Sequence, residues 1–429
     1  MEWALIVAVF GVNLVLWTLV GGLRLTSERR PQPPCADPPR TLRPSDVAVL
    51  IPAHNEEPVI AATIQSALRL VQPQNVHVVA DGCDDATAQI ARANGVNVLE
   101  ISPGRGKAGG IEAAVEHFDI PTRFAVLLIL DADTKLDDHY LERGLPLFDR
   151  PEVVAVAGYA RAGWHPQELT PVGRFLIAYR TRLYAVMQWL KYGQTWRWTN
   201  VTAIVPGFAS MYRTTVLNEM DLNPPGLVIE DFNMTFEIHH RRLGKIAFQP
   251  DVHATTQDPD NVRDYYRQVL RWYLGFWQTL RRHGFWLSGF SAALALFVTE
   301  VVVASLGLVL LIGAVVLLTP IVLINTLAQA LGLALDLGGF VEAFVVLSMI
   351  LVLAAGVDYV LTLLTAVAYR RPVLLRYGLG FLILRFVDAT AALRTMPQAW
   401  RARSDGRWIS PTRRPSTDSD PAAIPGRHP

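Results

Sequence analysis

The chain has 429 residues and a formal net charge of +1, and 51% of its residues are hydrophobic while 18% are charged. With a mean hydropathy of +0.26, it is too apolar for an ordinary soluble protein. The balanced charge, and the lack of a basic stripe with interleaved aromatic residues, give no indication of nucleic-acid binding.

The N-terminal segment has the features of a membrane anchor. Residues 3–23 carry no charge, and the run is long enough to span a bilayer. No basic segment precedes the run, while Arg24, Arg29 and Arg30 follow it. This pattern favours an uncleaved anchor whose C-terminal side lies in the cytoplasm. Six prolines in residues 30–44 then predict an extended linker.

The next part of the chain alternates between strands and helices. Apolar runs at 47–51, 76–80, 96–101 and 124–130 end in polar residues, and a helical stretch follows each of the first three. This alternation predicts a Rossmann-like, mostly parallel α/β sheet with right-handed crossovers. Ligands of such sheets bind at the carboxyl ends of the strands, so we expect a binding site at that edge.

Two carboxylates follow the fourth run. Asp131 and Asp133 are separated by a single alanine at the end of an uncharged strand. The two side chains repel each other unless a cation lies between them, and a Mg²⁺ ion that holds nucleotide phosphates needs only one or two protein carboxylates. Taken alone, the pair is better explained as a turn and helix cap, and only the neighbouring motifs favour a metal site.

Six motifs occur along the chain in a definite order. They are Pro52-Ala53-His54-Asn55-Glu56-Glu57, Asp81-Gly82, Gly106-Lys107-Ala108, Asp131-Ala132-Asp133, Glu230-Asp231 and Gln268-Val269-Leu270-Arg271-Trp272. Together they resemble the family-two inverting glycosyltransferases. The last motif resembles that of the membrane synthases of cellulose, chitin, hyaluronan and poly-N-acetylglucosamine. The resemblance covers roughly residues 47–283, and it implies a cytoplasmic GT-A domain that uses Mg²⁺ or Mn²⁺.

The resemblance also implies roles for the residues on the donor side. The donor would be bound by Pro52, Glu56, Asp81, Lys107, Asp131 and Glu230. Asp81 would contact the base or ribose, Lys107 the diphosphate, and Asp133 the metal ion, while Asp131 would contact ribose or metal-bound water. Without the resemblance, Asp81 fits an Asx-type turn and Lys107 a solvated surface lysine.

Glu230 and Asp231 follow a Pro-Pro-Gly turn and begin a predicted helix at about 231–243. From position alone, an acid in the first turn of a helix is a cap that the helix dipole stabilises. In the family that the chain resembles, the aspartate matching Asp231 is the general base that removes the proton of the acceptor hydroxyl. Burial that raises the pKa of a carboxyl group suits it for that role.

Gln268, Arg271 and Trp272 share one face of a predicted helix, because they lie at positions i, i+3 and i+4. Arg271 can neutralise a departing diphosphate, and Trp272 offers a flat apolar face to a sugar ring. The alternative is an ordinary amphipathic helix at the membrane surface, and both interpretations can hold together.

The C-terminal third is again hydrophobic. Residues 290–330 predict one long or two short spans, 340–369 another span, and 377–392 a helix in the membrane interface. Glu300 and Asp358 fall inside the spans, where acids indicate either a polar path for a polymer or a misplaced boundary. The predicted organisation is an anchor at 1–24, a linker at 25–45, a GT-A domain at 46–258, interfacial helices at 259–289, membrane helices at 290–395, and a basic, disordered tail at 396–429.

We therefore predict a multi-pass enzyme of the cell (plasma) membrane that transfers a hexosyl or N-acetylhexosaminyl group from a nucleotide sugar, with UDP the expected nucleotide. The favoured form is a processive β-polysaccharide synthase that exports its product. A single-transfer glycolipid enzyme is the alternative, and a non-catalytic membrane scaffold is a third, which the intact acid, base and Arg-Trp set argues against. The implied partners are the donor, a glycan or lipid acceptor, and membrane lipid, and an accessory subunit is compatible with this prediction.

Overall fold

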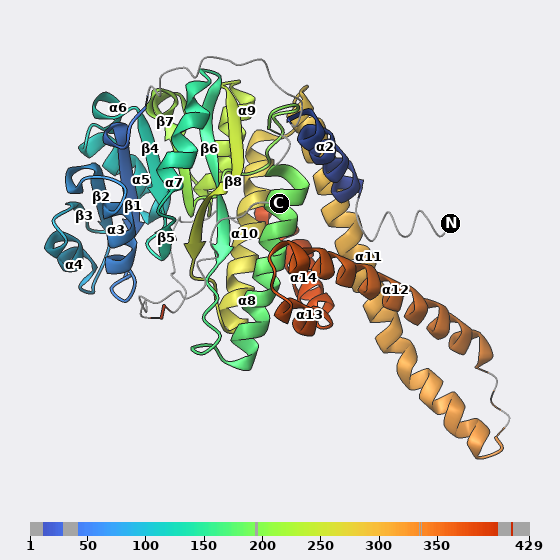
Figure 1. Ribbon diagram of the computed structural model, residues 1–429. Helices are drawn as coiled ribbons and strands as arrows, with labels where there is room; N and C mark the ends of the chain where they lie inside the picture. The colour runs from blue at the N-terminus through green and yellow to red at the C-terminus, as the bar shows by residue number, and fades with distance from the viewer. Residues whose placement is uncertain are drawn as a thin grey trace.

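The computed structural model describes residues 12–28, 42–193, 196–333, 335, 337–401 and 413–414. The first part of the predicted anchor, most of the proline-rich linker and most of the C-terminal tail lie outside these residues. Figure 1 shows a sheet domain in the first part of the chain and a group of helices in the last part.

In the described part of the chain, eight strands form one sheet in the spatial order β3-β2-β1-β4-β7-β6-β8-β5. Their bounds are β1 Val47–Ala53, β2 Val76–Asp81, β3 Asn97–Ile101, β4 Val126–Leu130, β5 Thr134–Leu136, β6 Val153–Ala162, β7 Ala209–Arg213 and β8 Lys245–Thr256. The first four strands pair in parallel, whereas β7 runs antiparallel to both β4 and β6. The sheet is therefore mixed, with its parallel part where the sequence predicted strands.

The parallel strands form the centre of the domain. Every residue of β1, β2 and β4 is buried, as continuous apolar runs predict for strands covered on both faces. The helices between these strands pack against the sheet, except the last, which packs against the helix before it. They are α3 Ile60–Leu68, α4 Thr87–Ala93, α5 Gly106–His117 and α6 Ile120–Arg123. Short 3₁₀ turns lie at Pro44–Asp46, Pro73–Asn75, Leu145–Asp149 and Thr214–Glu219.

The second half of the domain adds α7 Tyr140–Gly144, α8 Pro171–Tyr184, a π-helical continuation of α8 at Ala185–Tyr192, α9 Glu230–His240 and α10 Val262–His283. Thr170 caps α8 by accepting a hydrogen bond from the N–H of Gly173, and proline occupies the first turn. Asn261 caps α10 in the same way, and Gly284 ends it with φ of +65°. The caps define where α8 and α10 begin, and the two helices are in direct contact.

Among the residues that the structure describes, two helices are long and apolar enough by length and composition to cross a membrane, α11 Gly289–Ala330 and α12 Gly338–Ala368. They project from the sheet domain as a pair (Figure 1). With 42 residues, α11 is roughly 63 Å long at the usual helical rise, about twice the hydrocarbon thickness of a bilayer. The segment at 290–330 is thus one long helix, with Pro320 inside it.

The chain ends with α13 Val373–Gly378 and α14 Phe381–Arg401. The helix predicted at 377–392 for the membrane interface lies mostly in α14, which packs along α10 and α11. Its acid, Asp388, accepts hydrogen bonds from the hydroxyls of Tyr179 (2.7 Å) and Tyr265 (2.6 Å). This segment therefore joins the long apolar helix α11 to the sheet domain.

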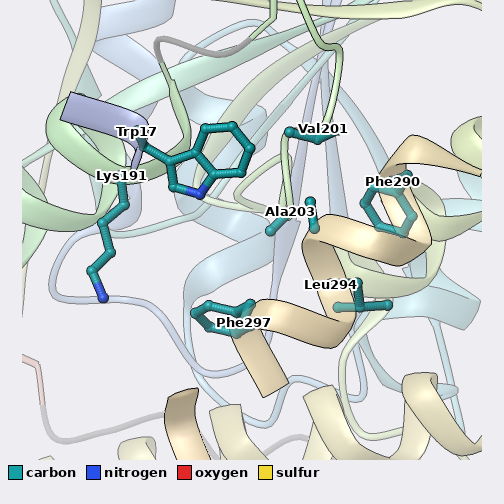
Figure 2. A pocket seen from close by; sticks show the side chains of 8 residues that line it. Trp17, Lys191, Val201, Ala203, Phe290, Leu294 and Phe297 are labelled. Carbon is teal, nitrogen blue, oxygen red and sulfur yellow. The ribbon is translucent and has the colours of Figure 1, made fainter. Parts of the chain in front are cut away.

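The described part of the predicted anchor is α2 Val12–Glu28, which packs beside the π-helical segment and α11. Figure 2 shows a small apolar pocket there, where Trp17 of α2 faces Val201 and the aromatic rings of Phe290 and Phe297. Lys191 also lines this pocket, and its Nζ pairs with Glu300 of α11 at 2.9 Å. The N-terminal helix α2 thus packs against the first part of α11.

Candidate active site

The carboxyl ends of β1, β2 and β4 meet at one edge of the sheet, because these strands are parallel neighbours. Pro52 lies within β1 opposite Val79 and is buried. The pairing of β1 with β4 ends at Leu50, so a proline at position 52 breaks no ladder bond on that side. Of the residues that the sequence selected, Pro52, Glu56, Asp81, Asp131 and Asp133 lie at or just after these strand ends.

Asp81, at the end of β2, binds the loop that precedes α5. Its two carboxylate oxygens accept hydrogen bonds from the backbone N–H groups of Arg105 and Gly106, both at 2.7 Å. Gly82 has φ of +63°, and a Cβ atom there would lie 3.1 Å from Gly104, so the position requires glycine. Asp81 therefore fixes the start of α5, and its contact with a nucleotide stays a prediction.

Lys107, in the first turn of α5, lies between two acids. Its Nζ is 2.7 Å from Asp131 Oδ1 and 2.7 Å from Glu230 Oε1. Burial lowers the pKa of Lys107, but the two carboxylates outweigh burial and raise it overall. The same ammonium holds the pKa of Glu230 below its usual value in spite of burial. Lys107 thus joins the end of β4 to the start of α9.

Asp231 lies beside this ion cluster in the first turn of α9. Its carboxylate accepts hydrogen bonds from the N–H groups of Gly207 (3.1 Å) and Phe232 (2.6 Å). Burial and the neighbouring charge of Glu230 raise its pKa to about 7. A carboxyl group with that pKa exchanges its proton readily near neutral pH, as a general base must.

Asp133 and Glu56 are joined by an arginine from the C-terminal tail. Arg413 pairs with Asp133 through Nη1 and with both oxygens of Glu56, at 2.8 and 3.1 Å. The backbone N–H and C=O of Arg414 bond to the amide of Gln257, at 2.9 and 3.1 Å. These two residues of the predicted tail thus lie against the strand edge that carries Asp133.

The chemistry of this edge fits a divalent cation. A guanidinium already neutralises Asp133 and Glu56, which shows that the position favours positive charge. The described residues contain no cluster of three side chains that could hold a metal alone. A Mg²⁺ ion that shares its coordination with a diphosphate needs only one or two carboxylates, so Asp133 suffices as the protein ligand.

The three motif residues of α10 have two different sets of neighbours. Arg271 lines a pocket with Lys107 and Glu230. Gln268 accepts a hydrogen bond from Arg180 of α8 at 2.6 Å, and the same guanidinium lies 4.3 Å from the centre of the Trp272 ring. One helix therefore contributes both to the ion cluster and to a contact with α8.

Sequence reasoning did not find Arg180, Asp258 or Arg413. Arg180 is one of three arginines in a helix of otherwise mostly apolar residues, and a charged residue in such a helix was the only available signal. Asp258 lies two residues after the end of β8, as Asp131 lies directly after β4, so a similar strand-end argument applies to it. Arg413 had no local signal, because its contacts cross 280 residues of sequence to Asp133 and more to Glu56.

Comparison with known proteins gives a consistent result. Residues 44–275 match the family model described as "Glycosyltransferase like family 2". A protein of Bacillus subtilis described as "Probable glycosyltransferase YdaM" is 26% identical over 53% of this chain and 54% of its own length. A dolichyl-phosphate hexose transferase of Haloferax volcanii is 34% identical over 24% of this chain and 43% of its own length. The chain thus spans about half the length of the curated relatives it matches.

Among solved structures, the mannosyltransferase PcManGT from Pyrobaculum calidifontis, in complex with GDP-Man and Mn²⁺, has a TM-score of 0.52 and 19% sequence identity. The alignment covers 83% of this chain and 96% of that chain. At this identity the similarity shows the fold, which is the GT-A fold that the sequence predicted.

Proposed function

The chain belongs to glycosyltransferase like family 2, and on that premise we propose that it is a metal-dependent, inverting enzyme that moves a sugar from a UDP-sugar to an acceptor hydroxyl at a membrane. The observation that carries this proposal is the position of Asp231. Its carboxyl group, with a pKa raised to about 7 by burial and by Glu230, lies next to an ion cluster that shares its pocket with Arg271.

The donor would bind at the strand edge. Asp133 would hold a Mg²⁺ or Mn²⁺ ion, which neutralises the charge that develops on the leaving diphosphate. Arg271, beside Lys107 in the same pocket, would add a second positive charge there. Lys107 would act by keeping Asp131 and Glu230 in place, because both acids already contact its ammonium.

The acceptor would approach from the side of α10. Asp231 would take the proton of the attacking hydroxyl, which lies on the face opposite the departing diphosphate in an inverting reaction. Trp272 would pack against the acceptor sugar, and Gln268 would hydrogen-bond to it. Attack by one deprotonated hydroxyl on an α-linked donor gives a β-linkage.

We propose further that the product is a polysaccharide that leaves through the membrane helices. A cavity of about 180 Å³ lies among α8, α10, α11, α12 and α14, and apolar side chains line it together with two tyrosines and several charged residues. Its charges are paired, since Asp358 contacts both Arg182 and Arg385 and Glu300 contacts Lys191. A wall of apolar side chains and paired charges suits an uncharged glycan better than a phosphate. We assign the enzyme to the plasma membrane with its sheet domain in the cytoplasm, because Arg24, Arg29 and Arg30 follow the N-terminal apolar run.

A lipid acceptor is the second candidate, and the similarity to a dolichyl-phosphate hexose transferase favours it. Purified enzyme incubated with a panel of labelled nucleotide sugars, followed by product sizing and solvent extraction, separates the two. A long, water-soluble or insoluble polymer supports the synthase, and a single-sugar product in the organic phase supports the lipid acceptor. Failure to transfer any sugar, with Mg²⁺ or Mn²⁺ present, would overturn the enzymatic proposal itself.

A further inference from the structure

Arg180 is a completely buried cation on α8, and it packs along one face of α10. Its guanidinium carbon lies 4.6 Å from the centre of the Tyr265 ring and 4.3 Å from the centre of the Trp272 ring. Its Nη2 donates a hydrogen bond to Gln268 Oε1 at 2.6 Å. Tyr265, Gln268 and Trp272 lie at i, i+3 and i+7, so one side chain contacts three consecutive turns of the helix.

The ion pair of Arg180 is less well formed than these contacts. Its Nε is 3.7 Å from Asp258 Oδ1, beyond hydrogen-bond distance, and that oxygen accepts the hydroxyl of Tyr184 at 2.6 Å. Among the described residues, neither Nε nor Nη1 of Arg180 has a hydrogen-bond partner. An arginine kept for a structural ion pair would form short, paired N–H to O bonds with its acid. The best contacts of the Arg180 guanidinium are instead with the amide of Gln268 and the ring of Trp272.

The hydrogen bond from Arg180 also fixes the orientation of the Gln268 amide. A glutamine side chain presents an acceptor oxygen and a donor NH₂ group. Because Arg180 can only donate, it holds the oxygen of Gln268 and leaves the NH₂ group as the end that can bind a substrate oxygen. The flat guanidinium also supports one face of the Trp272 ring, which leaves the other face for packing.

We propose that Arg180 is a positioning residue for the acceptor: it holds the Gln268 amide and the Trp272 indole in the orientation that receives the acceptor sugar. This inference rests on the proposed function and deepens it. Lysine would keep the charge opposite Asp258, but it offers neither a planar surface nor donors in a fixed plane. The Arg180→Lys variant therefore separates positioning from charge balance.

The test measures UDP release and sugar incorporation in the same reaction, with the UDP-sugar that the wild-type enzyme turns over. We expect Arg180→Lys to lower incorporation roughly 10- to 100-fold, the scale of a misplaced substrate, while donor affinity by calorimetry and the melting temperature stay near wild type. The fraction of donor hydrolysed by water should rise. Arg174→Lys, on the same helix but bonded to the backbone carbonyl of Leu169, is the matched control and should behave as wild type.

A double variant identifies the residue through which Arg180 acts. If Arg180 supports Trp272, then Arg180→Lys combined with Trp272→Phe should incorporate little less sugar than Trp272→Phe alone, because contacting residues are not additive. Multiplied losses, or an Arg180→Lys enzyme with wild-type incorporation, would overturn the positioning role and leave the proposed function intact. A wild-type enzyme without turnover would count against the proposed function instead.

Discussion

Replacing Asp231 with asparagine should separate catalysis from stability. Asparagine keeps the shape of the side chain and its oxygen, but it cannot accept a proton. Turnover should therefore fall by about 10²–10⁴-fold, the usual contribution of a general base, while donor affinity stays close to wild type. If Asp231 only caps α9, asparagine is an equally good cap and turnover should barely change.

The same substitution should stabilise the protein at alkaline pH. The pKa of Asp231 is raised from 3.8 to about 7 by burial and by Glu230. A carboxyl group with a raised folded-state pKa contributes stability that is fully present below its unfolded pKa and is lost as the pH rises through about 7. The difference of about three pH units corresponds to at most about 4 kcal/mol. Asp231→Asn should thus melt at a higher temperature than wild type at pH 8, and the difference should disappear near pH 4.

The assay is a pair of measurements on purified protein, initial rates against pH and melting temperature against pH. The wild-type rate should fall below about pH 7, where the base becomes protonated. Glu230→Gln is the control: it leaves Lys107 with one buried partner fewer and should lower the melting temperature, since breaking a buried pair costs about 3–5 kcal/mol. It should also move the acidic limb of the rate profile to lower pH, because the charge of Glu230 raises the pKa of Asp231. An active Asp231→Asn enzyme, or one that melts below wild type at pH 8, would refute this reasoning.

Three further outcomes follow from the site and the topology. Asp133→Asn should weaken UDP-sugar binding, measured by calorimetry with Mn²⁺, and should lower turnover as well. Unchanged donor affinity would make Asp133 only a strand cap. Turnover of the wild-type enzyme should stop in excess EDTA. Arg413→Gln should bind Mn²⁺ more tightly than wild type without donor, because the guanidinium competes for Asp133 and Glu56; equal affinity would mean that this ion pair does not form in solution. A cysteine placed at position 38 should resist membrane-impermeant reagents in intact cells, and labelling from outside would reverse the predicted orientation.

The parallel half of the sheet was predictable because its signal is local. β1, β2 and β4 are runs of buried apolar residues, and the polar residues that end them mark the edge where the site lies. The strands β6, β7 and β8 were not predicted. β7 inserts antiparallel between β4 and β6, and β8 pairs in parallel with β6, by contacts remote in sequence. Local patterns give the strands, and only tertiary packing gives their order.

The sequence predicted some residues of the candidate site, but it did not predict how they contact one another. Motif resemblance selected Lys107, Asp131 and Glu230, but it assigned them to the donor, whereas the structure joins them to one another in a single ion cluster. The contact between Asp133 and Arg413 was beyond sequence reasoning because nothing in an arginine-rich tail distinguishes one arginine from the next. Where the role of a residue depends on a distant partner, its type and spacing alone do not predict that role.

Helix α10 connects the candidate site to the C-terminal helices. Gln278 near its C-terminal end accepts a hydrogen bond from the N–H of Val228, at 3.0 Å, just before α9 and Asp231. Trp277, one residue earlier, donates to the carbonyl of Ala392 in α14 at 3.1 Å. The helix that carries Arg271 and Trp272 is therefore held on one side by the segment leading to Asp231 and on the other by α14. A movement of α14 would shift Arg271 and Trp272 relative to Asp231. If these residues have the proposed roles, the C-terminal helices help to set the geometry of transfer.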